Sequence, residues 1–379
     1  MNFNLSDEQK DLQAMFREFT DKEIRPRAQA MDETNELDEE LWSMMAEMGA
    51  FGIIIPEEYG GSGLGLLDMM IVIEEVVKGC GTIYNWIGTG NGPCSSGVLK
   101  YGTDEQKKKY IRPVATGEVK GAFALTEPNA GSDAGSLKTR AVIDGDNFII
   151  NGSKTFCTMA SKAENIFTIA RLIENGEDIG YGAILVPRAS KGLTTTEEHK
   201  MGQHGTPLNE IAYQDVVVPR ENLIGKPGQG LNVAFSCLNE IRTACGALSV
   251  GLAQEAIDQA VKYAKERVQF GKRISQFQNT QFVLAECQTK VDAARLLVYN
   301  SAAVLDEGKE NRALHSMCKY YAGEVCNDVV RKCLQVFGGY GYMKDYPIER
   351  IYRDAKITEI FDGTAEVHKI IISKEMGVR

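Results

Sequence analysis

The sequence lacks the ligand spacing of a metal site and the paired cysteines of a disulfide framework. Its nine cysteines are odd in number and never form Cys-x-x-Cys; they stand at positions 80, 94, 157, 237, 245, 287, 318, 326 and 333. Cysteines scattered in this way are typical of small buried side chains in a reducing compartment. No two of the four histidines stand at metal-ligand spacing: His199, His204, His315 and His368. We therefore expect neither disulfides nor a bound metal.

A basic excess and a long apolar run are missing as well. The 379 residues carry 42 Lys and Arg against 52 Asp and Glu, a formal net charge of −10. Nucleic-acid affinity depends on cations that neutralise phosphates, so this balance argues against a nucleic-acid partner. No uninterrupted apolar stretch is long enough to span a bilayer. A helix capped by Ser6, with Gln9 at the capping-box position, begins almost at once, so we expect no targeting peptide and a cytoplasmic protein.

Composition and pattern indicate three lobes. The chain is 43% hydrophobic and 25% charged, which is globular, and it is too long for one ordinary core. Residues 1–119 repeat apolar side chains at helical spacing, residues 120–226 form short β runs separated by turns, and residues 227–379 return to long helices. We predict an α+β fold with an N-terminal helical domain, a central and mostly antiparallel β domain, and a C-terminal four-helix bundle. The bundle helices are expected at about 231–268, 278–307, 311–336 and 364–376.

The stretch Tyr352–Thr364 ends in an Asp-Gly pair. We predict a helix end that breaks at Asp362, directly behind the apolar side chains of Ile360 and Phe361. A carboxylate against apolar surface loses hydration, which raises its pKa toward the range useful for a general base. Asp-Gly is also a common turn pair, and on local sequence alone a plain structural turn is the better interpretation.

Four further stretches suit a cofactor or an anionic ligand. Leu125–Asp133 ends a strand in small and hydroxyl residues with free backbone N–H groups, and Asn151–Thr158 offers an aromatic ring beside a hydroxyl. Arg267–Lys272 closes a helix with cations that suit a phosphate or simply complement the helix dipole. Gln335–Tyr342 places three glycines where the backbone can lie against a ligand. Each stretch alone is equally compatible with a turn or a chain reversal.

Taken together, in this order and spacing, the five stretches resemble the acyl-CoA dehydrogenase family over essentially the whole chain. The resemblance implies one non-covalent FAD per subunit, a homotetramer arranged as a dimer of dimers, and electron transfer to an electron-transfer flavoprotein. Asp362 falls on the position of the catalytic base, which would remove the α-proton of an acyl-CoA while the β-hydride passes to flavin N5. Backbone N–H donation by the base residue would stabilise the enolate oxygen.

The resemblance also assigns the remaining site residues. The isoalloxazine ring would be lined by Phe123, Leu125, Thr126, Phe156 and Thr158. Ser132 would contact the cofactor and the pantetheine arm of the thioester. An FAD held mainly by the neighbouring subunit would be reached by Arg267, Gln269, Phe270, Gln278, Gln335, Gly338 and Gly339. Thr364 and Glu366 fall on further FAD-contact positions. The substrate would meet Asn239 and Arg242 at its CoA portion, and Asn91 and Gly363 nearer the acyl group.

The sequence departs from the family pattern at the base itself. Most relatives carry Glu where this chain has Asp362, and one methylene less draws the carboxylate back by about 1.5 Å. At the family's second location for the base stands Ile241, which cannot accept a proton. We therefore expect a substrate that brings its α-carbon closer or needs extra room there. A compact alicyclic or α-branched acyl-CoA, such as cyclohexane-1-carboxyl-CoA, meets that description.

The stretch Tyr84–Leu99 is expected, by the same resemblance, to line the acyl end of the pocket. It has no arginine near Tyr84, which argues against a dicarboxylic thioester, and the neutral Asn91 favours ordinary 1,2-desaturation. Gly88, Gly90, Gly92 and Pro93 leave space for a short, wide acyl group, or else serve local backbone packing. Three alternatives stay open: the same chemistry on butyryl-CoA, a nitroalkane-type oxidase, and a flavin-bearing binding protein without dehydrogenase activity.

Overall fold

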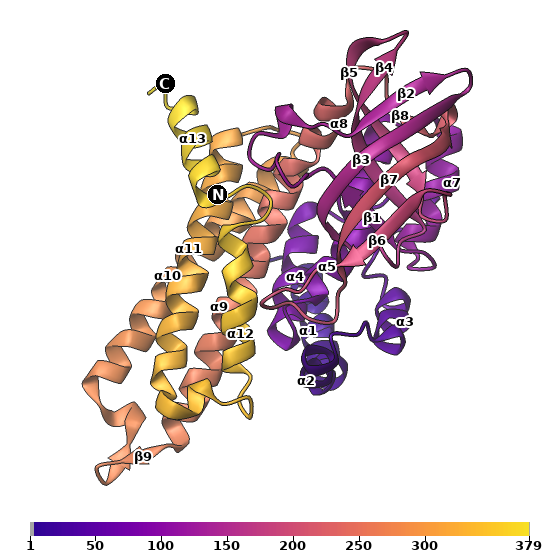
Figure 1. Ribbon diagram of the computed structural model, residues 1–379. Coiled ribbons are helices and arrows are strands. Elements are labelled where there is room, and N and C mark those ends of the chain that lie inside the picture. Colours follow the sequence, from indigo (N-terminus) through magenta and orange to yellow (C-terminus); the bar gives the residue numbers. More distant parts are fainter. Residues whose placement is uncertain (1–3, 379) are drawn as a thin grey trace.

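The computed structural model describes residues 4–378 and divides them into two helical parts and a sheet (Figure 1). The C-terminal bundle stands on one side and the sheet on the other, and N-terminal helices contact both. The predicted α+β fold, with its order of helices, sheet and helices, is confirmed. The domain limits at residues 119/120 and 226/227 stay a prediction.

The N-terminal part is built from seven helices. The predicted cap at Ser6 is present: its hydroxyl accepts from the Gln9 N–H and the Gln9 amide returns the bond, as a capping box. Apolar faces of α4 and α5 are almost wholly buried. The helices are α1 (Asp7–Phe19), α2 (Arg25–Thr34), α3 (Glu39–Glu47), α4 (Leu66–Gly79), α5 (Ile83–Asn91), α6 (Pro93–Tyr101) and α7 (Asp104–Ala115).

The central part is an eight-stranded sheet in the order β6-β7-β3-β2-β4-β5-β8, with β1 beside β4. Two neighbours of β4 run parallel to it, β1 and β2, and the other pairs are antiparallel. The predicted hairpin connects β2 and β3, with Asp144 paired to Asn147. The strands are β1 (Gly121–Ala124), β2 (Arg140–Asp144), β3 (Asn147–Thr158), β4 (Asn165–Glu174), β5 (Glu177–Pro187), β6 (Leu193–Glu197), β7 (Leu208–Pro219) and β8 (Leu223–Ile224).

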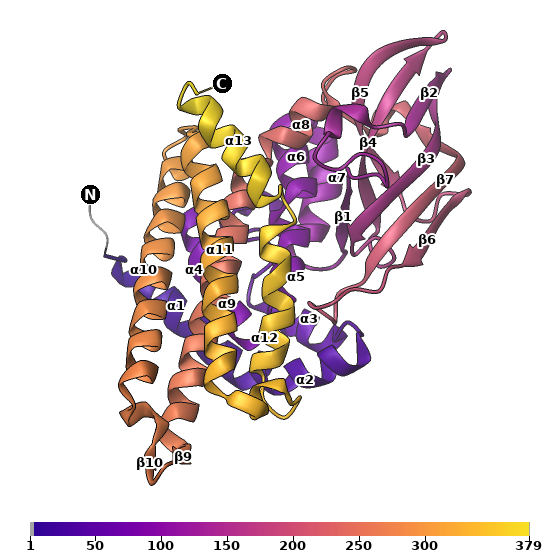
Figure 2. The same cartoon turned by 60° about the vertical axis from the view of Figure 1, so that its left-hand side comes forward.

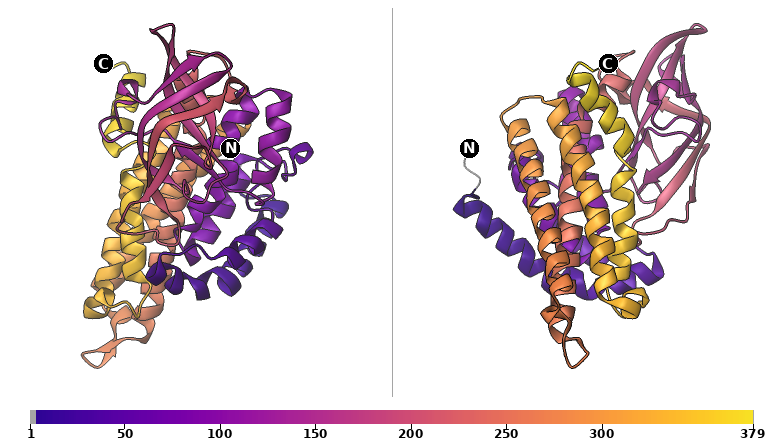
Figure 3. Two further views of the ribbon diagram at one scale, coloured as in Figure 1. Left: turned by 45° about the vertical axis from the view of Figure 1, so that its right-hand side comes forward. Right: turned by 90° about the vertical axis from the view of Figure 1, so that its left-hand side faces the viewer.

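The C-terminal bundle is dominated by three long helices that lie side by side (Figure 2). A small hairpin, β9 (Val268–Gln269) with β10 (Lys272–Arg273), projects from one end, and the C-terminus lies at the other (Figures 2 and 3). The helices are α8 (Gly230–Ser236), α9 (Leu238–Glu266), α10 (Gln278–Asp306), α11 (Arg312–Val336), α12 (Ile348–Ala355) and α13 (Ala365–Glu375). Two expectations are wrong in detail. The helix expected over 231–268 is interrupted at Cys237, and the helix expected to end at the Asp-Gly pair is the short α12, which ends earlier, at Ala355.

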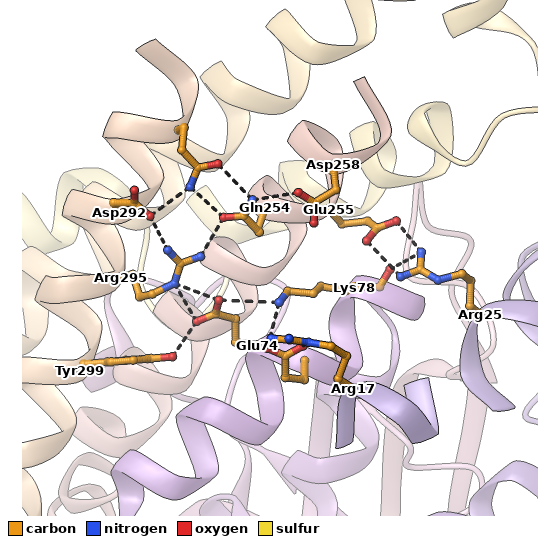
Figure 4. A network of polar contacts seen from close by, with 12 residues as sticks. Arg17, Arg25, Glu74, Lys78, Gln254, Glu255, Asp258, Asp292, Arg295 and Tyr299 are labelled. Atoms are coloured by element: carbon orange, nitrogen blue, oxygen red, sulfur yellow. Dashed lines mark hydrogen bonds and ion pairs between the residues drawn. The ribbon is translucent and has the colours of Figure 1, made fainter. Parts of the chain in front are cut away.

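A cluster of ion pairs ties the N-terminal helices to the bundle (Figure 4). Glu74 of α4 is 2% exposed and accepts from the Arg295 guanidinium of α10 at 2.9 and 3.2 Å. Arg25 of α2 pairs in the same way with Glu255 of α9. These buried carboxylates are paired, as burial of charge requires. The two helical parts thus meet through fixed polar contacts, in addition to a shared hydrophobic core.

The next features are membrane-spanning helices, metal-binding groups and cysteine pairs among the residues that the structure describes. No helix within residues 4–378 is both long and apolar enough to cross a bilayer. Across the same residues, His, Cys, Asp and Glu side chains form no group of three that could hold a metal ion. All nine cysteines are buried and unpaired.

Candidate active site

Asp362 lies on a tight turn between two helical segments. The chain leaves α12 at Ala355, passes through a 3-10 turn at Lys356–Glu359, and enters α13 after Thr364. The predicted helix end directly at the Asp-Gly pair is therefore wrong. Asp362 has φ +56° and Gly363 has φ +100°, so two successive residues are left-handed. A side chain in this conformation costs about 1–3 kcal/mol, and such strain is typical of functional sites.

Aromatic side chains form the wall beside the Asp362 carboxylate. The Tyr84 hydroxyl of α5 donates to Asp362 Oδ2 at 3.2 Å, and the Tyr84 ring lies 5.6 Å from that of Phe361. Ile360 is 49% exposed, so the expectation that it dehydrates the carboxylate is wrong. Tyr84, 278 residues away in sequence, takes that place.

Burial and nearby charges set the proton affinity of Asp362. Burial raises the pKa of the carboxyl to about 6, from an ordinary value of 3.8. The positive charge of Lys319, the bond from Tyr84 and the charge of Arg242 oppose that rise, in decreasing order. The direction agrees with the sequence expectation, and the carboxylate is the charged form at neutral pH. A partly buried carboxylate with this pKa is suited to accept a proton from a weak carbon acid.

A bulge in β3 turns Phe156 outward. Between Lys154 and Cys157 the strand gains one residue relative to β7, and Phe156 adopts φ +56° with 63% of its surface exposed. The Glu198 carboxylate holds this bulge, accepting from the Phe156 N–H at 2.8 Å and the Thr155 hydroxyl at 2.9 Å. An exposed, backbone-fixed aromatic ring is suited to stack on a flat ligand.

The two predicted strand-end motifs lie side by side. The Thr155 N–H donates to the Thr126 carbonyl at 3.0 Å, which joins the end of β1 to the β3 bulge. Leu125 and Thr126 are partly buried, as is Phe123, whose ring stacks 6.0 Å from that of Phe167. Two predicted positions lie at the margin of this group: Thr158, partly buried at the end of β3, and Ser132, exposed in the following loop.

A buried ion pair between Lys154 and Glu127 supports the Leu125–Thr139 loop, and the sequence did not predict it. Lys154 Nζ donates to Glu127 Oε1 at 2.9 Å and to the Leu125 carbonyl at 2.8 Å. The Glu127 carboxylate also accepts the N–H groups of Lys138, at 2.7 Å, and Thr139, at 2.9 Å. Lys154 is fully buried and Glu127 is 7% exposed. The Lys154–Glu127 pair therefore holds both ends of the Leu125–Thr139 loop, the Leu125 carbonyl through Lys154 and the Lys138 and Thr139 N–H groups through Glu127.

Asn239 and Arg242 stand one turn apart at the start of α9. Arg242 Nη1 donates to Asn239 Oδ1 at 3.2 Å. Burial lowers the pKa of the Arg242 guanidinium, and its buried Nε has no hydrogen-bond partner within residues 4–378. A buried guanidinium N–H normally finds an acceptor, so this group is suited to receive one from a ligand. Its charge also reaches Asp362.

Asn91, at the predicted acyl end of the pocket, bonds to the surrounding backbone. Asn91 is 3% exposed, its amide donates to the carbonyls of Ala50 and Ile87, and its oxygen accepts the Ile54 N–H. Backbone groups take three of the four hydrogen-bonding positions of its amide, so Asn91 serves chain packing here, and its contact with substrate stays a prediction.

The glycines of α5 differ from one another in what surrounds them. At Gly90 and Gly92 an added Cβ would lie 2.0 and 2.1 Å from a carbonyl oxygen, so both serve close backbone packing. At Gly88 nothing lies within 4 Å. Of the three glycines that were expected to leave room for an acyl group, only Gly88 has open space beside it.

The other predicted cofactor contacts gather at the opposite end of the bundle. A groove of ≈ 510 Å³ there is lined by five of them, Arg267, Gln269, Gln335, Gly338 and Gly339. Phe270 is 93% exposed at the tip of the hairpin, and Gln278 is exposed at the start of α10. Thr364, which caps α13, and the exposed Glu366 lie instead beside Asp362. The predicted contacts thus form two separate groups in one chain (Figure 2).

Family models match all three parts of the chain. Residues 6–118 match the acyl-CoA dehydrogenase N-terminal domain, residues 122–216 the middle domain, and residues 228–377 the C-terminal domain. The chain belongs to the acyl-CoA dehydrogenase family. Acyl-CoA dehydrogenases are oxidoreductases that act on the CH–CH bond of acyl-CoA thioesters.

Characterised acyl-CoA dehydrogenases resemble the chain over nearly its full length. The short-chain-specific acyl-CoA dehydrogenase of Clostridium acetobutylicum is 40% identical over 98% of this chain and 99% of its own. The caffeyl-CoA reductase-Etf complex subunit CarC of Acetobacterium woodii is 40% identical over 97% and 98%. The likeness therefore includes both dehydrogenases and a reductase.

Solved structures of the family agree with the fold throughout. The glutaryl-coenzyme A dehydrogenase glutaryl-CoA complex has a TM-score of 0.96 at 39% identity, covering 100% of this chain and 98% of the other. The acyl-CoA dehydrogenase from Bacillus anthracis complexed with FAD has a TM-score of 0.93 at 32% identity, covering 99% and 67%.

Proposed function

We propose that this chain is an FAD-dependent acyl-CoA dehydrogenase in which Asp362 removes the α-proton of a compact alicyclic or α-branched acyl-CoA. The main support for this proposal is the environment of the Asp362 carboxylate. The carboxylate is partly buried, accepts a hydrogen bond from Tyr84 and lies on a strained turn, and its pKa is raised to about 6. FAD, when bound, accepts the hydride that leaves the β-carbon. The exposed Phe156 and the strand ends at Leu125 and Thr126 fit a flat, polar cofactor.

Each residue of the site has a physical task in this reaction. Asp362 accepts the α-proton, and the Tyr84 hydroxyl keeps its carboxylate oriented through the 3.2 Å bond. The unpaired Arg242 N–H is suited to an acceptor on the substrate. Phe156, Leu125 and Thr126 would position the cofactor ring, with Glu198 fixing the bulge behind it. A reacting carbon held at about 3–3.5 Å from the base needs this degree of order.

The activity should depend on pH through Asp362. The base must be ionised to act, and its raised pKa places that ionisation near pH 6. We expect kcat/KM to fall about tenfold for each pH unit below 6 and to level off above it. Initial rates with a dye acceptor between pH 4.5 and 8 measure this, with flavin absorbance as a control for unfolding. A profile that stays flat down to pH 5 would contradict a base with this pKa.

The proposed acyl group rests on the length of the base and on the open space at Gly88 in α5, the helix that also carries Tyr84. Aspartate is one methylene shorter than glutamate, by about 1.5 Å, and open space lies beside Gly88. Anaerobic mixing with thioesters tests the proposal: cyclohexane-1-carboxyl-CoA should bleach the flavin, and butyryl-CoA should bleach it more slowly. Bleaching by butyryl-CoA alone would favour the short linear substrate, which the 40% identity to a short-chain-specific relative also supports.

Restoring the longer base should move the substrate preference. In Asp362→Glu we expect kcat/KM to rise for butyryl-CoA and to fall at least tenfold for cyclohexane-1-carboxyl-CoA, because a misplacement on the order of 1 Å costs ~10²-fold. The ratio of the two values, measured in one preparation, removes any effect of flavin content. An unchanged ratio would exclude base length as the determinant of the acyl group.

The physiological acceptor is proposed to be an electron-transfer flavoprotein. A relative at 40% identity is named as a subunit of an Etf complex, and it is a reductase. Both directions are therefore assayed: desaturation with an electron-transfer flavoprotein as acceptor, and reduction of the α,β-unsaturated thioester with a reduced donor. The base position serves both, because the same carboxylate returns the proton in reverse.

We propose a homotetramer arranged as a dimer of dimers, and the split between the two groups of cofactor contacts supports a flavin site shared by two copies. From Arg242 to Arg267 α9 rises by about 37 Å, so the hairpin group and the Asp362 group cannot surround one flavin ring. The exposed Phe270 and Tyr342, at 93% and 85%, also need cover. We expect light scattering of the FAD-bound protein to give four copies; a monomer that retains FAD would exclude a shared site.

A further inference from the structure

The Asp362–Gly363 turn needs support from the rest of the protein. Two successive left-handed residues, one of them not glycine, are held at φ +56° and +100°. Such a conformation persists only where the surrounding structure over-determines it. Tyr84 bonds to the side chain of Asp362 and not to its backbone. Other residues must therefore hold the backbone of the turn.

Lys319 of α11 reaches the turn from inside the bundle. It is 1% exposed, and its Nζ donates to the Gly363 carbonyl at 2.6 Å. A charge-assisted bond of this length is among the stronger hydrogen bonds in proteins. Burying an ammonium group is costly unless it is well paired. The buried ammonium group of Lys319 thus bonds to the backbone of the Asp362–Gly363 turn.

His368 closes the space behind the same turn from the first part of α13. Its side chain is fully buried, and an added Cβ at Gly363 would lie 2.9 Å from its Nε2. Within residues 4–378 neither ring nitrogen has a hydrogen-bond partner. Burial, together with the charges of Lys319 and Arg242, lowers the pKa of His368 to about 3, so the ring is neutral at working pH. It blocks relaxation of Gly363 toward α13 without adding charge.

We propose that Lys319 and His368 are positioning residues that hold the Asp362–Gly363 turn in its left-handed form, Lys319 by its bond to the Gly363 carbonyl and His368 by packing. The inference rests on the proposed function, in which Asp362 is the base. It adds that the cation of Lys319 favours the ionised base. The titratable and charged groups that face Asp362 from the packed elements are Tyr84, Arg242, Cys245, Lys319 and His368.

Three variants separate the charge from the geometry. Lys319→Met removes both bond and charge, Lys319→Gln keeps a donor without the charge, and His368→Gln replaces one neutral polar group by another. We expect the acidic limb of the kcat/KM profile, its decline at low pH, to move up by about one pH unit in both Lys319 variants, because the charge of Lys319 lowers the pKa of Asp362 and losing a nearby opposite charge raises a carboxyl pKa by about that amount or more. In His368→Gln the limb should stay in place. At pH 9 kcat should fall more in Lys319→Met than in Lys319→Gln.

A purely structural role for Lys319 would lower stability and flavin content without moving the pH limb, and that result would overturn the proposal. So would a shifted limb in His368→Gln. If Lys319→Met does not fold, the Lys319→Gln profile decides. The test is independent of the base assignment: an active Asp362→Asn protein refutes Asp362 as base, whereas an inactive Asp362→Asn with an unmoved limb in Lys319→Gln refutes the positioning role of Lys319. Melting temperature and flavin absorbance of each variant are recorded beside the kinetics.

Discussion

Asp362→Asn should retain its flavin, bind thioester and lose turnover by roughly 10²–10⁴-fold, the usual contribution of a general base. Asparagine has nearly the same shape and keeps an oxygen that can accept from Tyr84. It cannot take up a proton. The loss should therefore appear in kcat, with little change in the concentration of thioester needed for half-saturation.

The measurement is single-turnover reduction of the flavin by cyclohexane-1-carboxyl-CoA in the absence of oxygen. Asp345→Asn serves as the matched control, because Asp345 is an exposed carboxylate away from the site. A red-shifted flavin spectrum on adding thioester would show that the variant still binds ligand. Turnover of Asp362→Asn within a few-fold of the parent would remove Asp362 as the base, whereas a parent protein whose flavin is bleached by no thioester would be better interpreted as a flavin-bearing binding protein.

The sequence located the candidate base but not the groups that shift its pKa. Asp362 was found from an Asp-Gly pair behind apolar residues, together with motifs spread over the whole chain. Tyr84 and Lys319 come from α5 and α11, 278 and 43 positions away, and no local pattern connects them to the turn. Their roles depend on how helices pack. The raised pKa was predicted in direction, although Ile360 proved to face solvent.

The fold was predictable where period and turn chemistry agree. The β2–β3 hairpin and the long helices α10 and α11 follow from Asp-Gly turns and from apolar spacing. The helix break at Cys237 is not marked by a glycine or proline in the sequence. It occurs at the end of α8, which packs against β4 and β5 of the sheet. The eight-residue α12 is too short for a reliable period. Asn91 was assigned from family position, whereas its three backbone bonds exist only in the folded chain.

Glu127→Gln should be the most damaging change outside the base. Lys154 is fully buried, and burial lowers the pKa of its ammonium, against the opposing effect of Glu127. Removing the carboxylate charge leaves that cation uncompensated, which costs about 3–5 kcal/mol in buried pairs. The N–H groups of Lys138 and Thr139 bind different oxygens of Glu127, and glutamine keeps only one oxygen, so one of these N–H groups loses its acceptor as well. We expect a lower free energy of unfolding and loss of FAD on gel filtration, because the Leu125–Thr139 loop is no longer fixed.

The double variant Glu127→Gln with Lys154→Met distinguishes charge from shape. A buried pair replaced by neutral groups is often as stable as the original, whereas a half-removed pair is not. The double variant should therefore recover most of the unfolding free energy lost by Glu127→Gln alone, measured by urea denaturation. Recovery of stability without recovery of FAD would mean that the pair orders the flavin loop in addition to supporting the sheet. Glu127→Gln with unchanged stability and full flavin would refute both roles, because the single bond from Lys154 to the Leu125 carbonyl would then suffice to hold the loop.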